Sequence, residues 1–222
     1  MAITHVTQSA TIGMNGVTFV GVNTTGATLL VVSVSYYAGG GASPSVSDNK
    51  GNTWVGLTAR VQTQTGVRLF YTAATSVGTG HDITITGSSI FASVTLLVIA
   101  GTGAAPFEAE NGAGTAAAGP LATGSVTPAA SGALIVSGWA GMNATSNPVV
   151  TGLTQITSHN PNSGVNLAGG FGYTIQTTPA AINPSWAWTG TDPVAVAVAV
   201  FKASVAAAPA GERVTTFVSP PR

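Results

Sequence analysis

The sequence predicts an all-β protein, a β-sandwich or jelly roll. Apolar and polar residues alternate with a period of two over many short segments, which is typical of half-buried strands. No amphipathic helix of any length interrupts this pattern. Glycine-rich turns separate the segments, and the chain has 29 Gly and 12 Pro. Many short strands joined by such turns predict a sandwich or a jelly roll.

The predicted strands are rich in β-branched and aromatic residues, which favour an extended backbone. In chain order they are 28–37, 67–72, 82–86, 93–99 and 194–201. Turns are predicted between them at 39–41, 47–52, 78–80 and 87–89. The Val/Ala run at 194–201 is the longest apolar stretch, and it falls well short of the ~18 to 20 residues of a membrane-spanning helix. We therefore expect no membrane partner.

The second half of the chain repeats the order of the first half, which predicts an internal duplication. The matches are Leu30–Ser33 with Leu134–Ser137, Gly56–Thr58 with Gly152–Thr154, Gly66–Leu69 with Gly164–Leu167, Tyr71–Thr72 with Tyr173–Thr174, and Thr86–Gly87 with Thr189–Gly190. The alternative is that all-β chains share strand and turn patterns by chance.

The duplication divides the chain into segments. These are an N-terminal strand or arm at 1–23, a β-sandwich at 24–204 with halves 24–103 and 121–204, a Gly/Ala-rich connection at 104–120, and a C-terminal arm at 205–222. The connection is expected to cross the surface or to form an arm. The halves could form two sandwiches or one sandwich with pseudo-two-fold symmetry. We favour one, because each half offers only about five strands whose long edges need cover.

Charge is scarce in this chain. Only 5% of its residues are charged, against a usual share of roughly 25%, and six basic residues balance six acidic ones. This composition argues against a nucleic-acid partner, because such binding depends on Lys and Arg that neutralise phosphates. Its 45% apolar content argues against disorder. A neutral surface rich in Ser, Thr and Gly favours association with other subunits, and the alternative is a monomeric extracellular β domain.

The sequence shows no catalytic constellation. There is no Cys for thiol chemistry or for Cys-ligated metals. The pair His81–Asp82 is interpreted as a surface turn. Glu108 and Glu110, the only closely spaced carboxylates, lie in the Gly/Ala-rich connection, which is a poor platform for a positioned acid. No Gly-x-Ser-x-Gly elbow and no phosphate-binding loop is present. We expect no enzyme activity.

The most distinctive local motif is Asp48–Trp54. Asp48, Asn49 and Asn52 are candidate ligands for Ca²⁺, which prefers carboxylate and carbonyl oxygens. The alternative is an Asx-type turn in which Gly51 takes a positive φ and Trp54 closes the core. This alternative is favoured because one Asp supplies little charge for a divalent ion. No cofactor other than this candidate calcium ion is expected.

Aromatic residues offer a candidate glycan-stacking platform at Tyr36, Tyr37 and Trp139. Trp186 and Trp188 lie two residues apart, which places both on one face of a strand. The alternative, which we favour for the tryptophans, is that they fill the sandwich core with their large apolar area.

The final segment differs in composition from the rest. Its Val214–Val218 run favours a strand that adds to a neighbouring sheet, with Val214, Phe217 and Val218 as candidate docking residues. The alternative is a frayed tail.

Several of these motifs together resemble a known module. They are Leu-Leu-Val-Val-Ser-Val-Ser at 29–35, Asp-Asn-Lys-Gly-Asn-Thr-Trp at 48–54, Val-Arg-Leu-Phe-Tyr-Thr-Ala-Ala at 67–74, and the Ile-Thr-Ile-Thr strand at 83–86. This order resembles a jelly-roll, concanavalin-like β-sandwich that recurs in tailed-phage virion proteins and bacterial surface proteins. The likeness spans about 24–204. It implies display or attachment rather than catalysis, and it supplies no catalytic residues.

The leading hypothesis is a structural virion protein of a tailed phage, as a capsid decoration, head-fibre or tail-associated protein. Its partners would be other virion proteins and further copies of itself. The N-terminus lacks the basic and apolar regions of a secretory signal, which agrees with a location in the virion. One alternative is a carbohydrate-binding or adhesion module on a phage or bacterial surface, with a cell-surface glycan as its partner. A second alternative is a self-assembling filament or surface-layer subunit.

Overall fold

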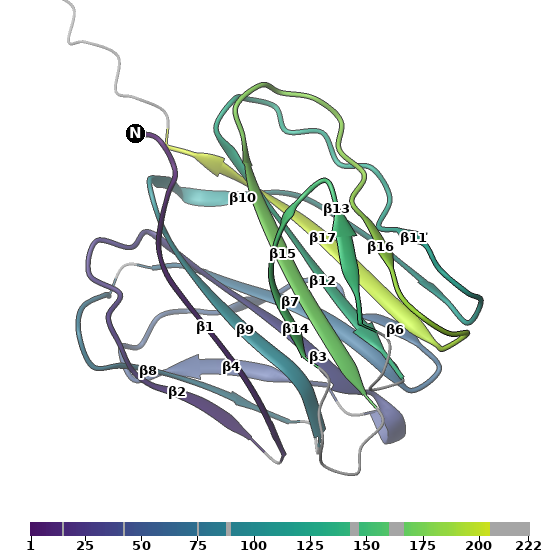
Figure 1. Cartoon of the computed structure of the whole chain (residues 1–222). Helices are drawn as coiled ribbons and strands as arrows, with labels where there is room; N and C mark the ends of the chain where they lie inside the picture. The colour runs from purple at the N-terminus through teal and green to yellow at the C-terminus, as the bar shows by residue number, and fades with distance from the viewer. Residues whose placement is uncertain are drawn as a thin grey trace, which may run out of the picture.

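The computed structural model describes residues 1–14, 16–41, 43–74, 76–87, 90–142, 147–159 and 167–204. Within these ranges the regular elements are strands, apart from one 3₁₀ turn at Gly39–Gly41. The predicted all-β class is therefore confirmed (Figure 1). Over the same ranges, no helix has the length and apolarity that crossing a membrane requires.

The first half of the chain forms β1–β9. Their bounds are β1 Thr4–Met14, β2 Val17–Val22, β3 Leu29–Tyr37, β4 Ser45–Asp48, β5 Val55–Gly56, β6 Arg60–Gln62, β7 Thr65–Ala73, β8 His81–Thr86 and β9 Ile90–Ala100. The second half forms β10–β17. Their bounds are β10 Thr102–Thr115, β11 Leu121–Ala122, β12 Ala133–Gly141, β13 Val149–Thr151, β14 Thr154–His159, β15 Ala168–Gln176, β16 Ser185–Ala187 and β17 Val194–Ala203. The five predicted strands are confirmed as β3, β7, β8, β9 and β17.

The strands form four antiparallel sheets, which we name A to D. Sheet A has the order β1-β9-β3-β7-β5, with β6 also paired to β7, and sheet B has the order β2-β8-β4. Sheet C has the order β10-β17-β12-β15-β14, and sheet D has the order β11-β16-β13. The strands of the two halves correspond one to one when β6 is left out: β1 to β5 correspond to β10 to β14, and β7 to β9 correspond to β15 to β17. With this correspondence, sheet A has the same strand order as sheet C, and sheet B has the same strand order as sheet D. The two halves thus share one strand order.

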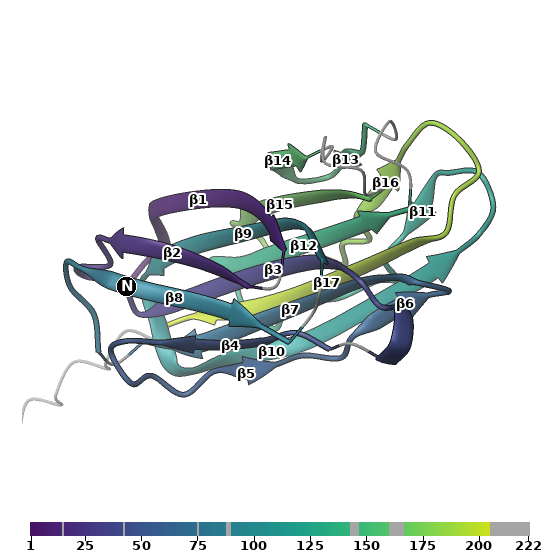
Figure 2. The same ribbon diagram turned by 90° about the horizontal axis from the view of Figure 1, so that it is seen from below.

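The sheets stack in the order B, A, C, D. One hydrophobic cluster joins A to C and includes Leu29, Val31, Leu134 and Phe171. A second cluster joins A to B, and a third joins C to D. A fourth packs sheet C against Val126 and Ile182, which pair with each other in an isolated bridge. Sheets B and D lie on opposite sides of the molecule (Figures 1 and 2). The chain therefore has four layers rather than the two of the single sandwich that we favoured, because each half supplies enough strands to close a sandwich of its own.

The central strands of sheets A and C, among them β3, β12 and β17, are consequently buried on both faces. In β17 the three alanines Ala195, Ala197 and Ala199 pack toward sheet A, while the valines between them pack toward sheet D. Both faces of β17 are therefore buried, and the Val/Ala alternation places large side chains on one face and small side chains on the other. The small side chains allow the two sandwiches to approach each other.

Small residues also line the A–C interface on β12, where Gly138 pairs with Ala197 of β17. A Cβ on Gly138 would lie 2.6 Å from Ser33 Oγ and 2.9 Å from Val67 Cγ2. The Ser35 hydroxyl donates a hydrogen bond to the Trp139 carbonyl at 2.7 Å across the same interface. The two sheets thus meet backbone to side chain here, which leaves no room for larger residues.

The prediction that 104–120 is a surface connection is wrong for most of its length, because 102–115 forms β10 and pairs with β17. Its glycines serve close packing. A Cβ on Gly112 would lie 2.6 Å from Arg60 Cγ, so the side chain of β6 lies directly against the strand backbone. A segment with few bulky residues became a strand because its neighbours supply the packing.

The first and last described residues meet. The amino group of Met1 donates hydrogen bonds to Ser204 Oγ at 3.0 Å and to the Ser204 carbonyl at 3.3 Å. The chain therefore leaves β17 beside the start of β1. The predicted arm residues Val214, Phe217 and Val218 lie outside the described residues.

Candidate functional site

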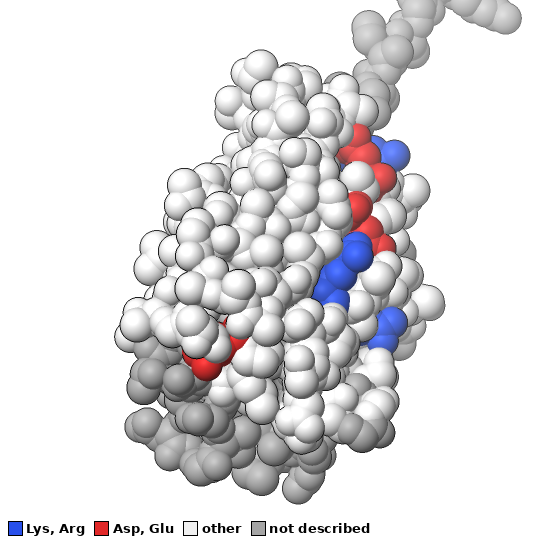
Figure 3. All heavy atoms as spheres, turned by 90° about the vertical axis from the view of Figure 1, so that its right-hand side faces the viewer, with Lys and Arg blue, Asp and Glu red and all other residues white. Residues whose placement is uncertain are grey.

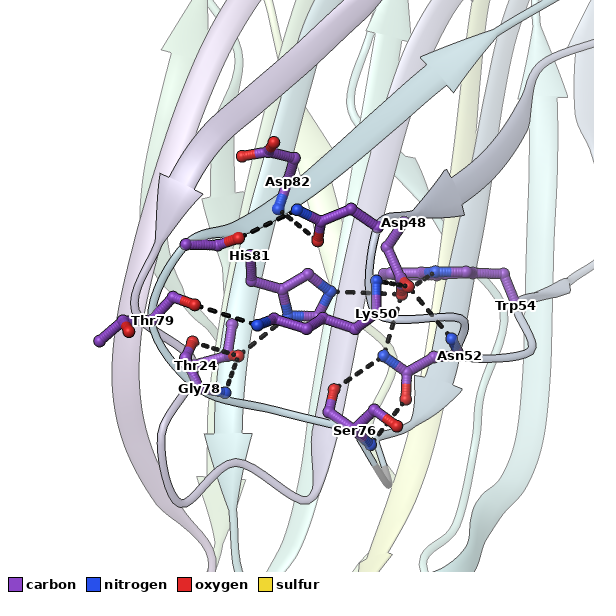
Figure 4. Close-up of polar contacts among 12 residues, drawn as sticks. Thr24, Asp48, Lys50, Asn52, Trp54, Ser76, Gly78, Thr79, His81 and Asp82 are labelled. Carbon is purple, nitrogen blue, oxygen red and sulfur yellow. Dashed lines mark hydrogen bonds and ion pairs between the residues drawn. The ribbon is translucent and has the colours of Figure 1, made fainter.

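The densest polar cluster lies at the end of the first sandwich, where β4 runs into the Asp48–Trp54 turn (Figure 4). The Asp48 carboxylate accepts four hydrogen bonds. Oδ1 accepts from the backbone N–H groups of Lys50 at 3.0 Å and Asn52 at 3.1 Å. Oδ2 accepts from Asn52 Nδ2 at 3.0 Å and from Trp54 Nε1 at 2.8 Å. The carboxylate thus holds the whole turn in place.

His81, at the start of β8, lies against the other side of Asp48. Its Nε2 is 3.3 Å from Asp48 Oδ2, and neither side chain has exposed surface. Its Nδ1 is 2.9 Å from the hydroxyl of Thr24. The interpretation of His81–Asp82 as a surface pair is therefore wrong, since His81 is buried and its carboxylate partner is Asp48. Asp82 instead accepts a hydrogen bond from the Gly21 N–H at 2.7 Å.

Thr24, His81 and Asp48 form a hydroxyl–imidazole–carboxylate chain, the arrangement that activates a nucleophile in many hydrolases. Here the Thr24 hydroxyl is fully buried and bridges the backbone of Gly78, donating to its carbonyl and accepting from its N–H, both at 3.1 Å. A substrate has no access to this oxygen. The chain of contacts therefore clamps β4, β8 and the 78–80 turn together.

The amide oxygens of the candidate calcium ligands are also occupied. Asn49 Oδ1 accepts from the Asp82 N–H at 3.0 Å, and Asn52 Oδ1 accepts from the Ser76 N–H at 3.0 Å. These N–H donors hold the two amide oxygens toward separate backbone groups, Asp82 and Ser76, and the oxygens do not converge on one point where a cation could bind. Gly51 has a φ of 74°, as an Asx-type turn requires at this position. The geometry therefore supports the turn, and the calcium site stays a prediction without geometric support.

Two opposing effects act on the pKa of Asp48. Burial raises it, whereas the hydrogen bonds from Asn52 and Trp54 and the contact with His81 lower it. The hydrogen bonds prevail, so the pKa of Asp48 lies below its ordinary value. The folded protein thus favours the ionised carboxylate. Over the described residues, no group of three or more His, Cys, Asp or Glu side chains is placed to hold a metal ion.

The proposed glycan platform loses two of its three members. Trp139 is 0% exposed and Tyr36 is 1% exposed, so neither ring can stack on a sugar. Both fall on the doubly buried central strands β12 and β3, where either face of the strand lies in a core. Tyr37 is partly buried at the end of β3. The three side chains therefore form no shared platform.

The two tryptophans of the Ser185–Thr189 segment behave as predicted. Trp186 is fully buried, Trp188 packs partly buried against the same C–D cluster, and both lie on one face. The indole N–H of Trp186 donates to Ser137 Oγ at 2.8 Å. These residues thus join sheet D to sheet C.

On the face drawn in Figure 3, most charged side chains form a band along one side, a separate acidic patch lies across from it, and white, uncharged residues cover most of the area between. The contacts of the charged side chains are structural. Glu110 on β10 accepts hydrogen bonds from the Thr58 hydroxyl at 2.8 Å and the Thr58 N–H at 3.0 Å, which ties the two halves together. Arg68 donates to the Leu57 carbonyl at 2.9 Å and lies over the Phe70 ring.

The first sandwich has an open edge along β1 and β2. Each is the end strand of its sheet, and a groove of about 500 Å³ lies between them. Its lining combines exposed apolar and small polar side chains, namely Val6, Thr7, Ser9, Val20, Gly21, Val22 and Asn23. Val20 is 77% exposed, more than is usual for a valine in a strand. Sequence reasoning placed an N-terminal strand or arm here but did not identify the groove.

A second groove, of about 430 Å³, lies where the two halves meet. It is lined by the 51–55 turn, Tyr71 and Ala73 from the first half and Ala104–Pro106 from the second. No charged side chain lines it. Comparison of the chain with protein-family models, with curated proteins and with solved structures finds no match.

Proposed function

We propose that this chain is a non-enzymatic structural protein of a tailed-phage virion, which docks on a protein lattice as a capsid decoration, head-fibre or tail-associated protein. The observation that carries the proposal is the scarcity of charged side chains, only 5% of the residues, which leaves large uncharged areas on the exterior (Figure 3). Monomeric soluble proteins keep apart from one another through charge. An exterior with few charges, and two end strands that lie open beside a groove, fit a protein covered by other subunits.

The use of the few charges supports the same proposal. Asp48 and Glu110 bind backbone and side-chain donors of their own chain, and Arg68 binds a carbonyl of its own chain. These groups stabilise the fold and are not directed into either groove. A protein whose charged side chains bind groups of its own chain is better suited to attachment than to catalysis.

The fold proposal is finer than the all-β class. We propose that each half is a jelly roll and that the chain arose by duplication of one half. A jelly roll has eight strands, so we count β5 and β6 together as the fifth strand, which makes β7, β8 and β9 the sixth, seventh and eighth. Sheet A then has the order 1-8-3-6-5 and sheet B has the order 2-7-4. Sheets C and D have the same two orders. The equivalence extends to register, since Val31 pairs with Tyr71 and Val136 pairs with Tyr173 in the same core cluster.

The test of the function is the location of the protein in its native setting. Particles purified from the culture that produces the chain would be analysed by mass spectrometry and by immunogold electron microscopy with an antibody to the folded chain. The proposal expects a fixed ratio to capsid or tail proteins and label at one site on the particle. Recovery of the chain only free in solution or on the cell surface would contradict it.

A glycan array distinguishes the carbohydrate-binding alternative. Because Tyr36 and Trp139 are buried, we expect no binding that depends on them. Specific glycan binding by the folded chain would support the adhesion module instead. The self-assembling subunit keeps specific support, because the edge of β1 has no partner strand within the described residues.

A further inference from the structure

We propose that the open β1–β2 edge is an acceptor site for the C-terminal segment of a second copy of this chain. Val214–Val218 of one copy would add as an antiparallel strand beside β1 of the next, with Phe217 in the groove between β1 and β2. This inference goes beyond the proposed virion role and holds for any assembly in which copies of the chain meet.

The first step is the state of β1. This strand spans Thr4–Met14 and pairs only with β9 within the described residues. Its pairing with β9 is regular from Thr7 to Thr11, between two register shifts. Natural edge strands are usually protected by Lys, Pro, inward-facing charge or β-bulges. The chain has no Asp, Glu, Lys or Arg before Asp48, and β1 has no Pro, so neither charge nor Pro protects this edge. The two register shifts lie outside Thr7–Thr11 and leave that stretch regular.

The second step is the groove. β2 is the end strand of sheet B, so the open edges of both sheets of the first sandwich border the same groove of about 500 Å³. Val6 and Val20 are 38% and 77% exposed beside it. A strand added to β1 would direct every second side chain into this groove. Backbone hydrogen bonds would supply affinity, and the groove would select the side chains.

The third step is the donor. Val214–Val218 reads Val-Thr-Thr-Phe-Val, five residues that favour a strand, and its length equals that of the regular stretch Thr7–Thr11. With Phe217 and Thr215 on the groove side, Val214 and Val218 fall on the opposite face. The segment carries no charge, so its burial beside an uncharged edge removes no ionised group from water.

The length of chain between Ser204 and Val214 determines whether Val214–Val218 can pair with β1 of its own copy or only with β1 of a second copy. The chain leaves Ser204 beside Met1, at the start of β1. The ten steps from Ser204 to Val214 extend at most about 33–36 Å. Running beside β1 as far as Thr11 already uses about 34 Å. No length remains for the reversal that antiparallel pairing with Thr7–Thr11 of the same copy requires. All strand pairs in the described residues are antiparallel, so a second copy is the favoured acceptor.

The test is analytical ultracentrifugation of the full chain and of variants on each side of the contact. The full chain is expected to form assemblies of two or more copies. Deletion of 205–222 removes the donor, Phe217→Ala weakens it, and Val20→Lys places a charge in the acceptor groove. Each is expected to lower the assembled mass to that of one chain or to raise the dissociation constant at least tenfold. Val149→Lys is the matched control, because Val149 is 59% exposed on an end strand of sheet D and should leave assembly unchanged.

Mixing provides the decisive arm. The deletion variant keeps an intact acceptor, and Val20→Lys keeps an intact donor. Neither should assemble alone, and a mixture should form a complex that contains both. A full chain that stays monomeric overturns the proposal, as does assembly that survives deletion of 205–222 or a mixture that forms no complex. A monomer whose β1 amides lose hydrogen-exchange protection on deletion would place the segment on its own copy, which also overturns it. These outcomes leave the virion proposal to its own test.

Discussion

Replacement of Asp48 should destabilise the protein more than replacement of any other carboxylate tested. Asp48→Ala removes the acceptor of four hydrogen bonds and leaves the buried Nε2 of His81 without its carboxylate partner. A hydrogen bond to a charged group contributes about 1.5–3 kcal/mol, and some of these donors can turn to water instead. We therefore expect Asp48→Ala to lower the free energy of unfolding by about 3–5 kcal/mol, a large part of the stability of an ordinary domain.

The isosteric variant separates the two sides of the carboxylate. Asp48→Asn keeps an oxygen for the backbone N–H groups of Lys50 and Asn52 but turns an NH₂ group toward the donors Asn52 Nδ2 and Trp54 Nε1. We expect a loss of about 2–3 kcal/mol. Asp82→Ala is the control, because Asp82 accepts one exposed hydrogen bond, from Gly21, and should cost about 1 kcal/mol.

Urea unfolding followed by tryptophan fluorescence measures these differences, with an unchanged dependence on urea as the sign that only stability changed. If Asp48→Ala lowers the free energy of unfolding no more than Asp82→Ala does, then Asp48 does not hold β4, β8 and the 78–80 turn together as we infer. Calcium enters the same assay. Since N–H donors occupy the oxygens of Asp48, neither Ca²⁺ nor a chelator should shift the unfolding midpoint of the natural chain. A calcium-dependent gain that disappears in Asp48→Ala would instead establish a calcium site.

Three further predictions concern the acid limb and the packing between sheets. The folded pKa of Asp48 is lowered, so its contribution is complete above the unfolded value of about 3.9 and is lost as pH falls through the folded value; the stability of Asp48→Asn should therefore fall less between about pH 5 and 2 than that of the natural chain, as urea unfolding at each pH would show. Gly138→Ala should cost about 1–3 kcal/mol through its contact with Ser33, and Ser33→Ala should recover part of that loss in a double-mutant cycle; strictly additive losses would count against close packing of sheets A and C. Trp186→Phe should cost about 2–4 kcal/mol in thermal unfolding, because it removes the hydrogen bond to Ser137 and leaves a cavity, and a neutral result would place this ring outside the core.

The strand class was predictable because β-branched residues and turn glycines act locally. The layering was not. Strands such as β3 and β12 are buried on both faces, so their apolar runs carry no inside–outside alternation. Sequence matching paired Leu30 with Leu134, yet Leu30 packs toward sheet B and Leu134 toward sheet A. The residue that shares the orientation of Leu134 is Leu29, and a slip of one residue exchanges the two faces of a strand.

Of the contacts around Asp48, those within the turn were predictable and the one with His81 was not. The spacing of Asp48, Gly51 and Trp54 indicated a turn, because Asx geometry depends on residues close in the chain. The contact between Asp48 and His81 depends instead on the pairing of β4 with β8, which no local signal specifies. The strand β10 was missed for the same reason, since its Gly112 is accommodated by packing against Arg60 from a distant strand.

The central claim is that this sparsely charged exterior serves for contact with other subunits. The most direct measurement is sedimentation of the full-length chain up to its solubility limit, at low and at high salt. The account predicts association that strengthens with concentration and hardly responds to salt, because few charges are present to be screened. A chain that remains single throughout this range, or an association that salt dissolves, would contradict it.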